Sequence, residues 1–209
     1  MKILLTAGAT REPIDAVRFV SNVSTGTTGA LLADELGRRG HSVVLLRGTA
    51  SAVPPSALET EFFSSAGDLR ARLQRRLGTG QFDAVIMTAA VADFRPAETS
   101  GGKISSAVPE LTLKLVRNEK ILPQLKSFSP RPLRVIGFKL TVGVDEAARA
   151  TAVKAQFAQG GVDAVVHNDL AEIRTAKIHP FSLWRSAEGN PLRLQGVPAL
   201  AEQLAAMLA

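Results

Sequence analysis

The chain has 209 residues, 45% hydrophobic and 21% charged, a composition typical of a globular domain and not of a disordered segment. It contains no cysteine, which excludes disulfides, a cysteine nucleophile and thiolate metal sites. No apolar run approaches the ~18 residues that cross a bilayer, and the chain enters its first strand without a leader-like segment. We therefore expect one domain, residues 1–209, in a soluble cytoplasmic protein.

The net charge of +6 and the isoelectric point of 10.2 suggest a polyanionic partner, because positive charge attracts polyanions. The basic residues are scattered, however, and the pairs Arg38-Arg39 and Arg75-Arg76 fall late in expected helices, where cations suit the helix dipole. Aromatic residues make up only 5%, too few for the stacking platforms that bind single strands. We expect a small anionic substrate, and neither a nucleic-acid nor a membrane partner.

Strands and helices alternate along the chain. The expected strands are Ile3–Leu5, Ser42–Leu46, Glu61–Phe63, Phe82–Met87, Arg134–Phe138 and Asp163–His167. The expected helices are Thr27–Arg39, Ala66–Leu77, Val144–Gln159 and Val197–Leu208. Near-continuous apolar strands between helices indicate an α/β fold with a doubly wound, mostly parallel sheet.

Two segments interrupt this alternation. Within residues 99–118, three leucines of the stretch Leu111–Val116 alternate with a threonine, a lysine and a valine, which predicts an antiparallel arm between the fourth and fifth strands. Further on, PFSLWR and PLRLQ are expected to pair as a hairpin across residues 187–190. A lone two-stranded arm is marginal in water, so we expect it to pair with the arm of a second subunit in a homodimer.

The first thirty residues predict an anion-binding site. A strand, a glycine turn and a helix N-terminus together point backbone N–H groups at a phosphate, and the helix dipole favours the negative charge. The residues at the turn and the helix start are Gly8, Ala9, Thr10, Ser24 and Gly26. The polar loop between them adds two cations and an amide, which are Arg11, Arg18 and Asn22.

Loops after the other strands are expected to converge on the same crevice, because such sheets bind ligands at the carboxyl ends of their strands. The small side chains of Ala89 and Ala90 would leave backbone groups to read the edge of a planar base. Asp93 then offers a carboxylate, and Lys103 a mobile cation. The alternative explanation is tight packing for the alanines and simple solvation for the lysine.

Several familiar sites are missing. The chain has no G-x-x-x-x-G-K-[ST] sequence, so it is not a P-loop NTPase. No G-x-G-x-x-G follows the first strand and tyrosine is absent, and both observations argue against the hypothesis of a dinucleotide-dependent reductase. The histidines His41, His167 and His179 lack metal-ligand spacing.

The same residues carry a resemblance to a known family. The sequence TAGATREPIDAVRFVSNVSTGTTG, then AAVADFRP, the pair Lys103-Ile104, VIGF and HND occur in the order found in phosphopantothenate–cysteine ligases. The resemblance covers Met1 to about Asp169. It implies a Rossmann-like sheet with an inserted dimerisation arm, and a role in coenzyme A biosynthesis.

That resemblance implies a two-step reaction. A nucleoside triphosphate activates the carboxylate of 4′-phosphopantothenate, pyrophosphate leaves, and the amine of cysteine attacks the acyl-nucleotidylate to form an amide. Mg²⁺ accompanies the triphosphate, its protein ligands are left open, and no flavin is expected. A separate phosphopantothenoylcysteine decarboxylase is the implied partner in the pathway.

Residue roles follow from the matching motifs. Asn22 would hold the acyl-nucleotidylate, and Lys103 would neutralise charge as this intermediate forms or breaks down. Arg11 and Arg18 would join Asn22 at the substrate. The residues expected around the nucleotide are Gly8, Ala9, Thr10, Ser24, Gly26, Ala89, Ala90, Asp93, Asn118, Glu119, Lys120, Ile121, Leu122, Phe138 and Lys154.

The motifs leave the choice of nucleotide open. Ala89–Pro96 resembles the bacterial motif of CTP-dependent members, whereas Phe138-Lys139-Leu140 is closer to the eukaryotic, ATP-dependent pattern. Asn118-Glu119-Lys120 replaces a common Asn-Pro-Asp, and Lys154 is one lysine where two are usual. We expect CTP, with ATP as the alternative. The competing functions are an NADP-type oxidoreductase that uses Arg47, and a non-catalytic nucleotide-binding protein.

Overall fold

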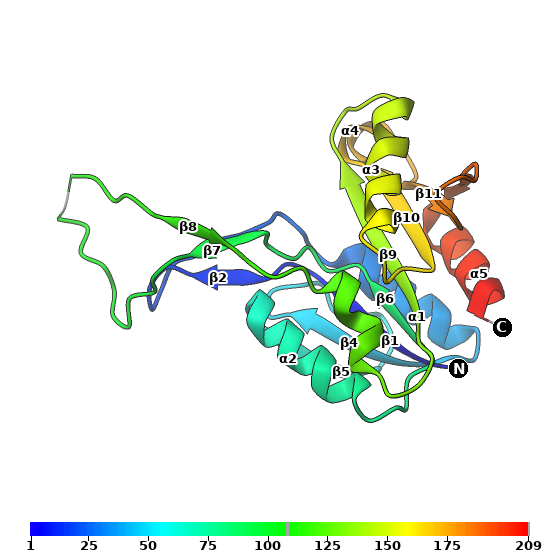
Figure 1. The fold of residues 1–209 in the computed structure, drawn as a ribbon, viewed down its shortest axis with the longest axis horizontal. Helices are drawn as coiled ribbons and strands as arrows, with labels where there is room; N and C mark the ends of the chain where they lie inside the picture. The colour runs from blue at the N-terminus through cyan, green and yellow to red at the C-terminus, as the bar shows by residue number, and fades with distance from the viewer. Residues whose placement is uncertain (108, 209) are drawn as a thin grey trace.

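A computed structural model describes residues 1–107 and 109–208 and has an eight-stranded sheet at its centre (Figure 1). The strand order is β12-β11-β10-β9-β6-β1-β4-β5. Their bounds are β1 Lys2–Ala7, β4 Ser42–Gly48, β5 Glu59–Phe63, β6 Ala84–Met87, β9 Arg134–Thr141, β10 Ala164–Asp169, β11 Pro180–Trp184 and β12 Leu192–Gln195. Six neighbouring strands of this sheet run parallel: β5, β4, β1, β6, β9 and β10. Their order along the sheet is that of dinucleotide-binding folds. The expected doubly wound, Rossmann-like fold is confirmed.

Helices cover both faces of the sheet. Helices α1 (Thr27–Arg38) and α5 (Gly196–Leu208) pack on one face, and α2 (Ala66–Leu77), α3 (Glu146–Ala158) and the 3₁₀ helix η1 (Leu122–Phe128) cover the other. Ile3 and Leu5 point to the first face and Leu4 to the second, all fully buried. Burial on both faces explains why the strands are continuous apolar runs. No helix among residues 1–107 and 109–208 combines the length and apolarity needed to cross a membrane.

Two Asp-Ala-Val sequences fix the register of the sheet. Asp83, just before β6, accepts a 2.7 Å hydrogen bond from the Lys2 N–H, and its own N–H donates to the Lys2 carbonyl. Asp163, just before β10, makes the same pair of bonds with Val135 of β9. Each aspartate therefore fixes the register between its strand and the neighbouring strand. The register in turn determines where the carboxyl ends of the two strands lie relative to each other.

The arm projects from one side of the sheet (Figure 1). Strand β7 (Phe94–Pro96) pairs with β8 (Leu115–Arg117), and next to them β2 (Arg11–Pro13) pairs with β3 (Phe19–Ser21). The inserted arm is confirmed, but the strand expected over Leu111–Val116 is shorter and shifted, because its partner β7 has only three residues and ends at a proline. Val108, within the expected range 99–118, lies outside the described residues.

The other differences lie at element ends. The hairpin β11–β12 is confirmed, and the N-terminal polar loop proves to contain the β2–β3 hairpin. Strands β1, β4, β9 and β10 run two or three residues further than expected, because their carboxyl ends carry mostly polar or small residues that lack a strand pattern. Helix α4 (Leu170–Thr175) was not expected.

Gly8, at the end of β1, lies in close contact with the turn that follows β4. It has φ +85°, and a Cβ there would lie 2.5 Å from the Ser51 Cβ and 3.3 Å from the Gly48 nitrogen. Gly40, which ends α1, has φ +86° with nothing within 4 Å of such a Cβ. The two glycines share a left-handed backbone and differ in the space around them.

Alanine substitutions at Gly8 and Gly40 distinguish the cost of a left-handed backbone from the cost of a steric clash. We expect Gly40→Ala to lower the free energy of unfolding by about 1–2 kcal/mol, the cost of a left-handed alanine. Gly8→Ala should cost at least about 1 kcal/mol more, because the added methyl overpacks the contact with Ser51. Urea denaturation of both variants measures the difference, and equal losses would show that the segments around Gly8 yield easily.

Candidate functional site

The loops after β1 and β6 form one continuous surface. The Ala90 N–H donates to the Gly8 carbonyl at 2.8 Å, and the Thr10 N–H donates to the Ala90 carbonyl at 3.2 Å. The buried Thr10 hydroxyl accepts from the Ala92 N–H at 3.0 Å. These bonds place Gly8, Ala9 and Thr10 directly beside the segment Ala89–Asp93, as the sequence predicted.

The same bonds overturn one expectation. The Ala89 N–H donates to the Thr6 hydroxyl at 3.2 Å, and both backbone groups of Ala90 are used between the two loops. The Ala92 N–H is bonded to Thr10. The expectation that the small alanines leave their N–H groups to read a base edge is therefore wrong.

The N-terminus of α1 lies against this surface. Gly26 is its N-cap, with φ +74°, and a Cβ on Gly26 would lie 2.9 Å from the Gly8 nitrogen. No side chain caps the helix, and its first turn contains no acidic residue. The N–H groups of the first turn and the positive end of the helix dipole are the features that bind phosphate. Ser24 precedes this cap and is half-buried.

The β2–β3 hairpin presents Asn22. Its exposed side chain donates from Nδ2 to the Val91 carbonyl at 3.2 Å. The neighbouring Ser21 hydroxyl donates to the Thr10 carbonyl at 2.8 Å. Asn22 therefore lies on the loop after β6, which is bonded to the turn after β1.

The chain after β8 closes the other side of this loop. The Asn118 N–H donates to the Asp93 carbonyl and its Nδ2 to the Ala92 carbonyl, both at 2.9 Å. Lys120 Nζ lies 2.6 Å from Asp93 Oδ1, and both side chains are exposed. Ile121 is buried in the core, so its side chain is not exposed to a nucleotide, whereas Leu122 is half-buried against that core. Glu119 is exposed, with its carboxylate 3.5 Å from Arg70 Nε.

The three cations expected at the substrate differ in their surroundings. The Arg11 guanidinium lies 4.3 Å above the Phe19 ring. Arg18 donates from Nη2 to the Ile104 carbonyl at 3.0 Å, so its guanidinium holds the arm. Lys103 is exposed and lies next to that bond. The sequence predicts Arg18 at the substrate, and the structure adds this bond between its guanidinium and the arm.

Strands β9 and β10 end in a buried polar network. Asp169 accepts from the Thr141 hydroxyl at 2.6 Å and from the N–H groups of Gly143 and Ala171, each at 2.9 Å. Burial favours its neutral form, but these donors outweigh burial and lower the pKa of Asp169 well below its ordinary value. His167 Nε2 lies 2.8 Å from the same Thr141 oxygen. Burial lowers the pKa of His167.

This network sets the end of β9, where Phe138 is half-buried against the α1 face. Next to Asp169, Asn168 is half-buried and its Nδ2 lies 3.0 Å from His179 Nε2. The carboxyl ends of β9 and β10 thus lie along the same edge as those of β1 and β6, as expected for a parallel sheet.

Lys154 is not brought to this edge. Its Nζ lies 3.9 Å from Glu188 in the turn between β11 and β12. Val165 near the start of β10 pairs with Trp184, so that turn lies at the amino end of β10. Helix α3 runs back from the carboxyl end of β9, and Lys154 in its second half is carried away from the site.

Metal-binding groups are scarce in the described part of the chain. Residues 1–107 and 109–208 contain no group of three histidine or carboxylate side chains placed to hold a metal ion. Asp93, the carboxylate in the loop after β6, is paired with Lys120. Magnesium commonly binds through substrate phosphates and water, with few protein ligands.

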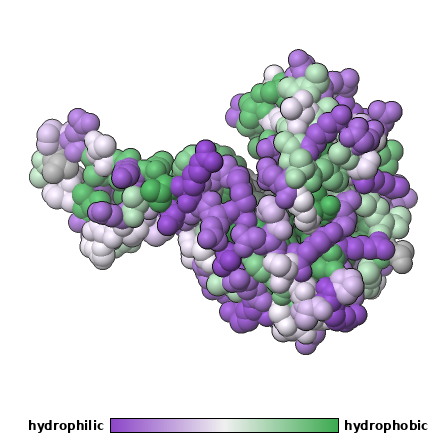
Figure 2. All heavy atoms as spheres, in the orientation of Figure 1, coloured by the Kyte–Doolittle hydropathy of each residue, from purple (hydrophilic) through white to green (hydrophobic). Residues whose placement is uncertain are grey.

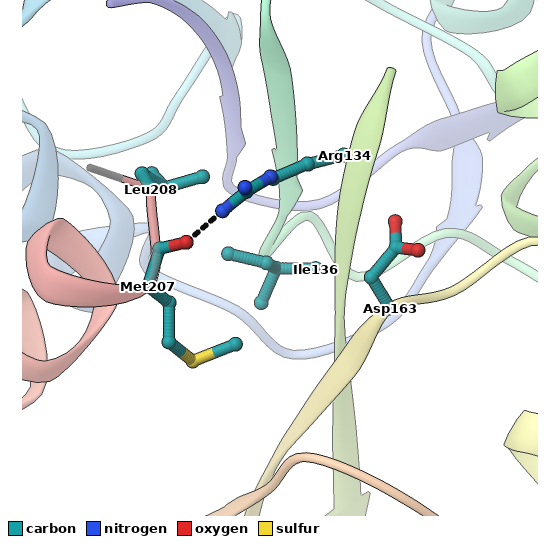
Figure 3. A pocket seen from close by; sticks show the side chains of 5 residues that line it. All are labelled: Arg134, Ile136, Asp163, Met207 and Leu208. Atoms are coloured by element: carbon teal, nitrogen blue, oxygen red, sulfur yellow. Dashed lines mark hydrogen bonds between the residues drawn. The ribbon is translucent and has the colours of Figure 1, made fainter. Parts of the chain in front are cut away.

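A cavity of about 160 Å³ lies at the opposite edge (Figure 3). It is lined by Arg134 and Asp163 at the amino ends of β9 and β10, by Ile136, and by Met207 and Leu208 of α5. The Arg134 guanidinium donates to the Met207 carbonyl (Figure 3). None of the residues expected at the site lines this cavity.

Comparisons with known proteins agree with this description. The family model of the DNA/pantothenate metabolism flavoprotein C-terminal domain matches residues 1–208. A curated relative, the coenzyme A biosynthesis bifunctional protein CoaBC of Mycobacterium bovis, is 34% identical over 202 residues, which cover 93% of this chain and 48% of that protein. The chain thus spans about half the length of this relative.

Two solved structures share the fold. A DNA/pantothenate metabolism flavoprotein from Streptococcus pneumoniae aligns with a TM-score of 0.88 at 26% identity, over 100% of this chain and 98% of that one. A Cab2 mutant in complex with phosphopantothenate-cysteine aligns with a TM-score of 0.81 at 18% identity, over 99% of this chain and 86% of that one.

Asp169 predicts a pH-dependent contribution to stability. Asp169→Asn removes a charged acceptor and should lower the free energy of unfolding by about 2 kcal/mol at pH 7. Because the folded-state pKa is lowered, this difference should persist above about pH 5 and shrink as the pH falls below about 3.9, the unfolded value. Urea denaturation at pH 7, 5 and 3.5 measures it. Asp145→Asn, at the exposed N-cap of α3, is the control and should change little. A difference for Asp169→Asn that is independent of pH would contradict the assignment.

Proposed function

The chain belongs to the family of the DNA/pantothenate metabolism flavoprotein C-terminal domain, and we propose that it is a ligase that joins 4′-phosphopantothenate to L-cysteine in coenzyme A biosynthesis. One observation carries the proposal. Asn22 contacts the loop after β6 beside an uncapped helix N-terminus, and the segment that bears Lys103 is bonded to the same hairpin. The amide donor Asn22 therefore lies beside a helix N-terminus suited to an anion, and the segment that bears the exposed Lys103 is bonded to the turn at the other end of the hairpin.

The reaction that fits this site has two steps. The carboxylate oxygen of 4′-phosphopantothenate attacks the α-phosphorus of the nucleotide, and the α–β bridging bond breaks to release pyrophosphate. The cysteine amine then attacks the acyl carbon, loses a proton, and expels the nucleoside monophosphate. The first step joins two anions, so aligned N–H groups and cations lower its barrier.

Asn22 and Lys103 have distinct roles in this proposal. The amide of Asn22 can donate and accept at once, which suits an intermediate with carbonyl and phosphate oxygens. Lys103 acts as a compact charge beside the phosphate where negative charge develops. The N-terminus of α1, with Gly8 and Gly26, holds phosphate oxygens. Mg²⁺ would accompany the triphosphate and offset its negative charge, and no residue of this chain is assigned as its ligand.

We propose CTP as the nucleotide, from the resemblance of Ala89–Pro96 to the bacterial motif. Because the N–H groups of Ala89 and Ala90 are already bonded, base recognition falls to other groups, such as the exposed part of Asn118–Lys120 and the half-buried Phe138. The oxidoreductase alternative gains no support. Its key residue Arg47 donates to the Ser51 carbonyl at 2.6 Å and lies 4.7 Å above the Phe62 ring.

We also propose a homodimer formed through the arms. Phe94 of β7 and the leucines of the returning segment are exposed, and Figure 2 shows apolar residues along the arm. These leucines are Leu111, Leu113 and Leu115. A second copy would bury this stripe on both subunits at once. The amide product carries the cysteine carboxylate, which is the group that a phosphopantothenoylcysteine decarboxylase removes in the next step.

A reconstituted assay tests the function. Purified protein with 4′-phosphopantothenate, cysteine, Mg²⁺ and either CTP or ATP should release pyrophosphate and form the amide. We expect kcat/KM to be at least tenfold higher with CTP. A tenfold preference for ATP would reverse the nucleotide assignment. If neither nucleotide gave pyrophosphate release that depends on 4′-phosphopantothenate, the proposed ligase activity would be refuted.

Asn22→Asp tests the amide. A carboxylate would repel the phosphate of the intermediate at close range, and we expect amide formation to fall by about 100-fold or more, the scale of a lost oxyanion donor. The matched control is Asn190→Asp, the same change at an exposed position in the β11–β12 turn. Amide formation at the wild-type rate in Asn22→Asp would remove Asn22 from the mechanism.

Lys103→Gln tests the cation. Its charge should matter most as negative charge develops, so we expect kcat to fall by about 100-fold with little change in the KM for the nucleotide. Lys177→Gln, at an exposed lysine outside the arm, should retain full activity. A rise in KM with unchanged kcat would mean that Lys103 only binds the nucleotide.

The exposed apolar residues of the arm predict that the protein is a dimer in solution. Light scattering at micromolar concentration should give the mass of two chains. Leu113→Glu should shift the mass toward one chain, because a charge would interrupt the apolar stripe. Lys114→Glu, a charge change at the next exposed residue, is the control and should leave the mass unchanged. A wild-type protein that is monomeric and fully active would contradict the dimer.

A further inference from the structure

The turn between β2 and β3 contains a buried carboxylate, Asp15, that bonds to two separate segments. Its Oδ1 accepts from the N–H groups of Val17, at 2.9 Å, and Arg18, at 2.7 Å. Its Oδ2 accepts from the Ile104 N–H at 3.1 Å, in the arm 89 residues further along the chain. The side chain is fully buried.

Further bonds tie the same part of the arm to the hairpin. Arg18 donates to the Ile104 carbonyl at 3.0 Å, and its guanidinium lies 3.5 Å from Asp15. On the other side of Lys103, the Gly102 carbonyl accepts from the Ala16 N–H at 3.5 Å. The backbone of Lys103 is therefore held on both sides, while its side chain is exposed.

The need for this restraint follows from the sequence. Lys103 is preceded by Gly101 and Gly102, and a Cβ on either glycine would meet nothing within 4 Å. Glycines in open space give the backbone wide conformational freedom. Without the bonds to the hairpin, the lysine would sample many positions relative to Asn22.

We infer that Asp15 is a positioning residue for Lys103: it fixes the Lys103 segment to the turn of the β2–β3 hairpin, whose other end presents Asn22, and so restricts the positions that Lys103 can take relative to Asn22. The inference rests on the proposed function for the reaction it serves. A misplacement of about 1 Å can cost a factor of 100 in rate, so a restraint on Lys103 has a measurable effect on kcat.

An aspartate suits this position better than an asparagine. Three N–H groups and a guanidinium surround the carboxylate, and a carboxylate offers only acceptors. The bond from Val17, with those from Ile104 and Arg18, outweighs burial and lowers the pKa of Asp15, so the group is ionised at neutral pH. An asparagine would turn an NH₂ group toward one of these donors.

The first test measures coupling in the ligase assay. Asp15→Asn should lower kcat by about tenfold or more and change the KM for the nucleotide by less than twofold. In the Lys103→Gln background, the same substitution should change kcat by less than twofold, because residues that act through one another are not additive. Asp145→Asn, at the N-cap of α3, is the matched control and should leave kcat unchanged. A tenfold loss in both backgrounds would overturn the inference.

The second test does not depend on activity. Amide hydrogen exchange should show a protected Ile104 N–H in the wild type and at least tenfold faster exchange in Asp15→Asn, with the amides of β1 unchanged. Trypsin should also cleave after Lys103 faster in this variant. Asp15→Glu, which keeps the charge, should exchange at an intermediate rate and replaces Asp15→Asn if that variant does not fold. Equal exchange at Ile104 in the wild type and the variant would overturn the inference. A protein without ligase activity but with this exchange pattern would refute the proposed function and leave the restraint established.

Discussion

The buried hydroxyl of Thr10 accepts the Ala92 N–H, and the candidate site depends on this bond and its neighbours. Together with the hydrogen bonds from the Ala90 N–H to the Gly8 carbonyl and from the Thr10 N–H to the Ala90 carbonyl, it joins the ends of β1 and β6 into one surface. The other parts are then added to that surface. Asn22 and Asn118 donate to carbonyls of the loop after β6. Gly26, the N-cap of α1, lies so close to Gly8 that a Cβ on Gly26 would be 2.9 Å from the Gly8 nitrogen. A reaction in which charge develops at one place is favoured by hydrogen-bond donors that are already held in position there.

Most of the fold could be predicted because it follows from local pattern. Apolar runs with helical spacers identify a parallel sheet, and the carboxyl ends of its strands locate the crevice without knowledge of any side chain. Helix α2 begins and ends where expected, since Ser65 caps its start and Gly78 follows its end. The glycine turn at Gly8 was identifiable for a similar reason, because one residue type fits that backbone.

The rest depends on contacts between distant residues. Asp15 accepts the N–H of Ile104, 89 residues away, and a lone buried aspartate leaves no sequence pattern. Lys154 was misplaced because spacing cannot tell how far α3 carries it along the sheet. The alanines of the β6 loop were correctly located, yet their backbone groups were wrongly expected to be unbonded, because pairing between loops becomes visible only in three dimensions.

The central claim is that this edge of the sheet activates a carboxylate as an acyl-nucleotidylate. A quench experiment without cysteine tests it most directly. Protein in excess over 4′-phosphopantothenate, mixed with CTP and Mg²⁺, should release one pyrophosphate per acid consumed and accumulate an acyl-cytidylate detectable by mass spectrometry. Added cysteine should convert that species to the amide without further CTP. Release of orthophosphate and CDP in place of pyrophosphate would reveal an acyl phosphate and contradict the account.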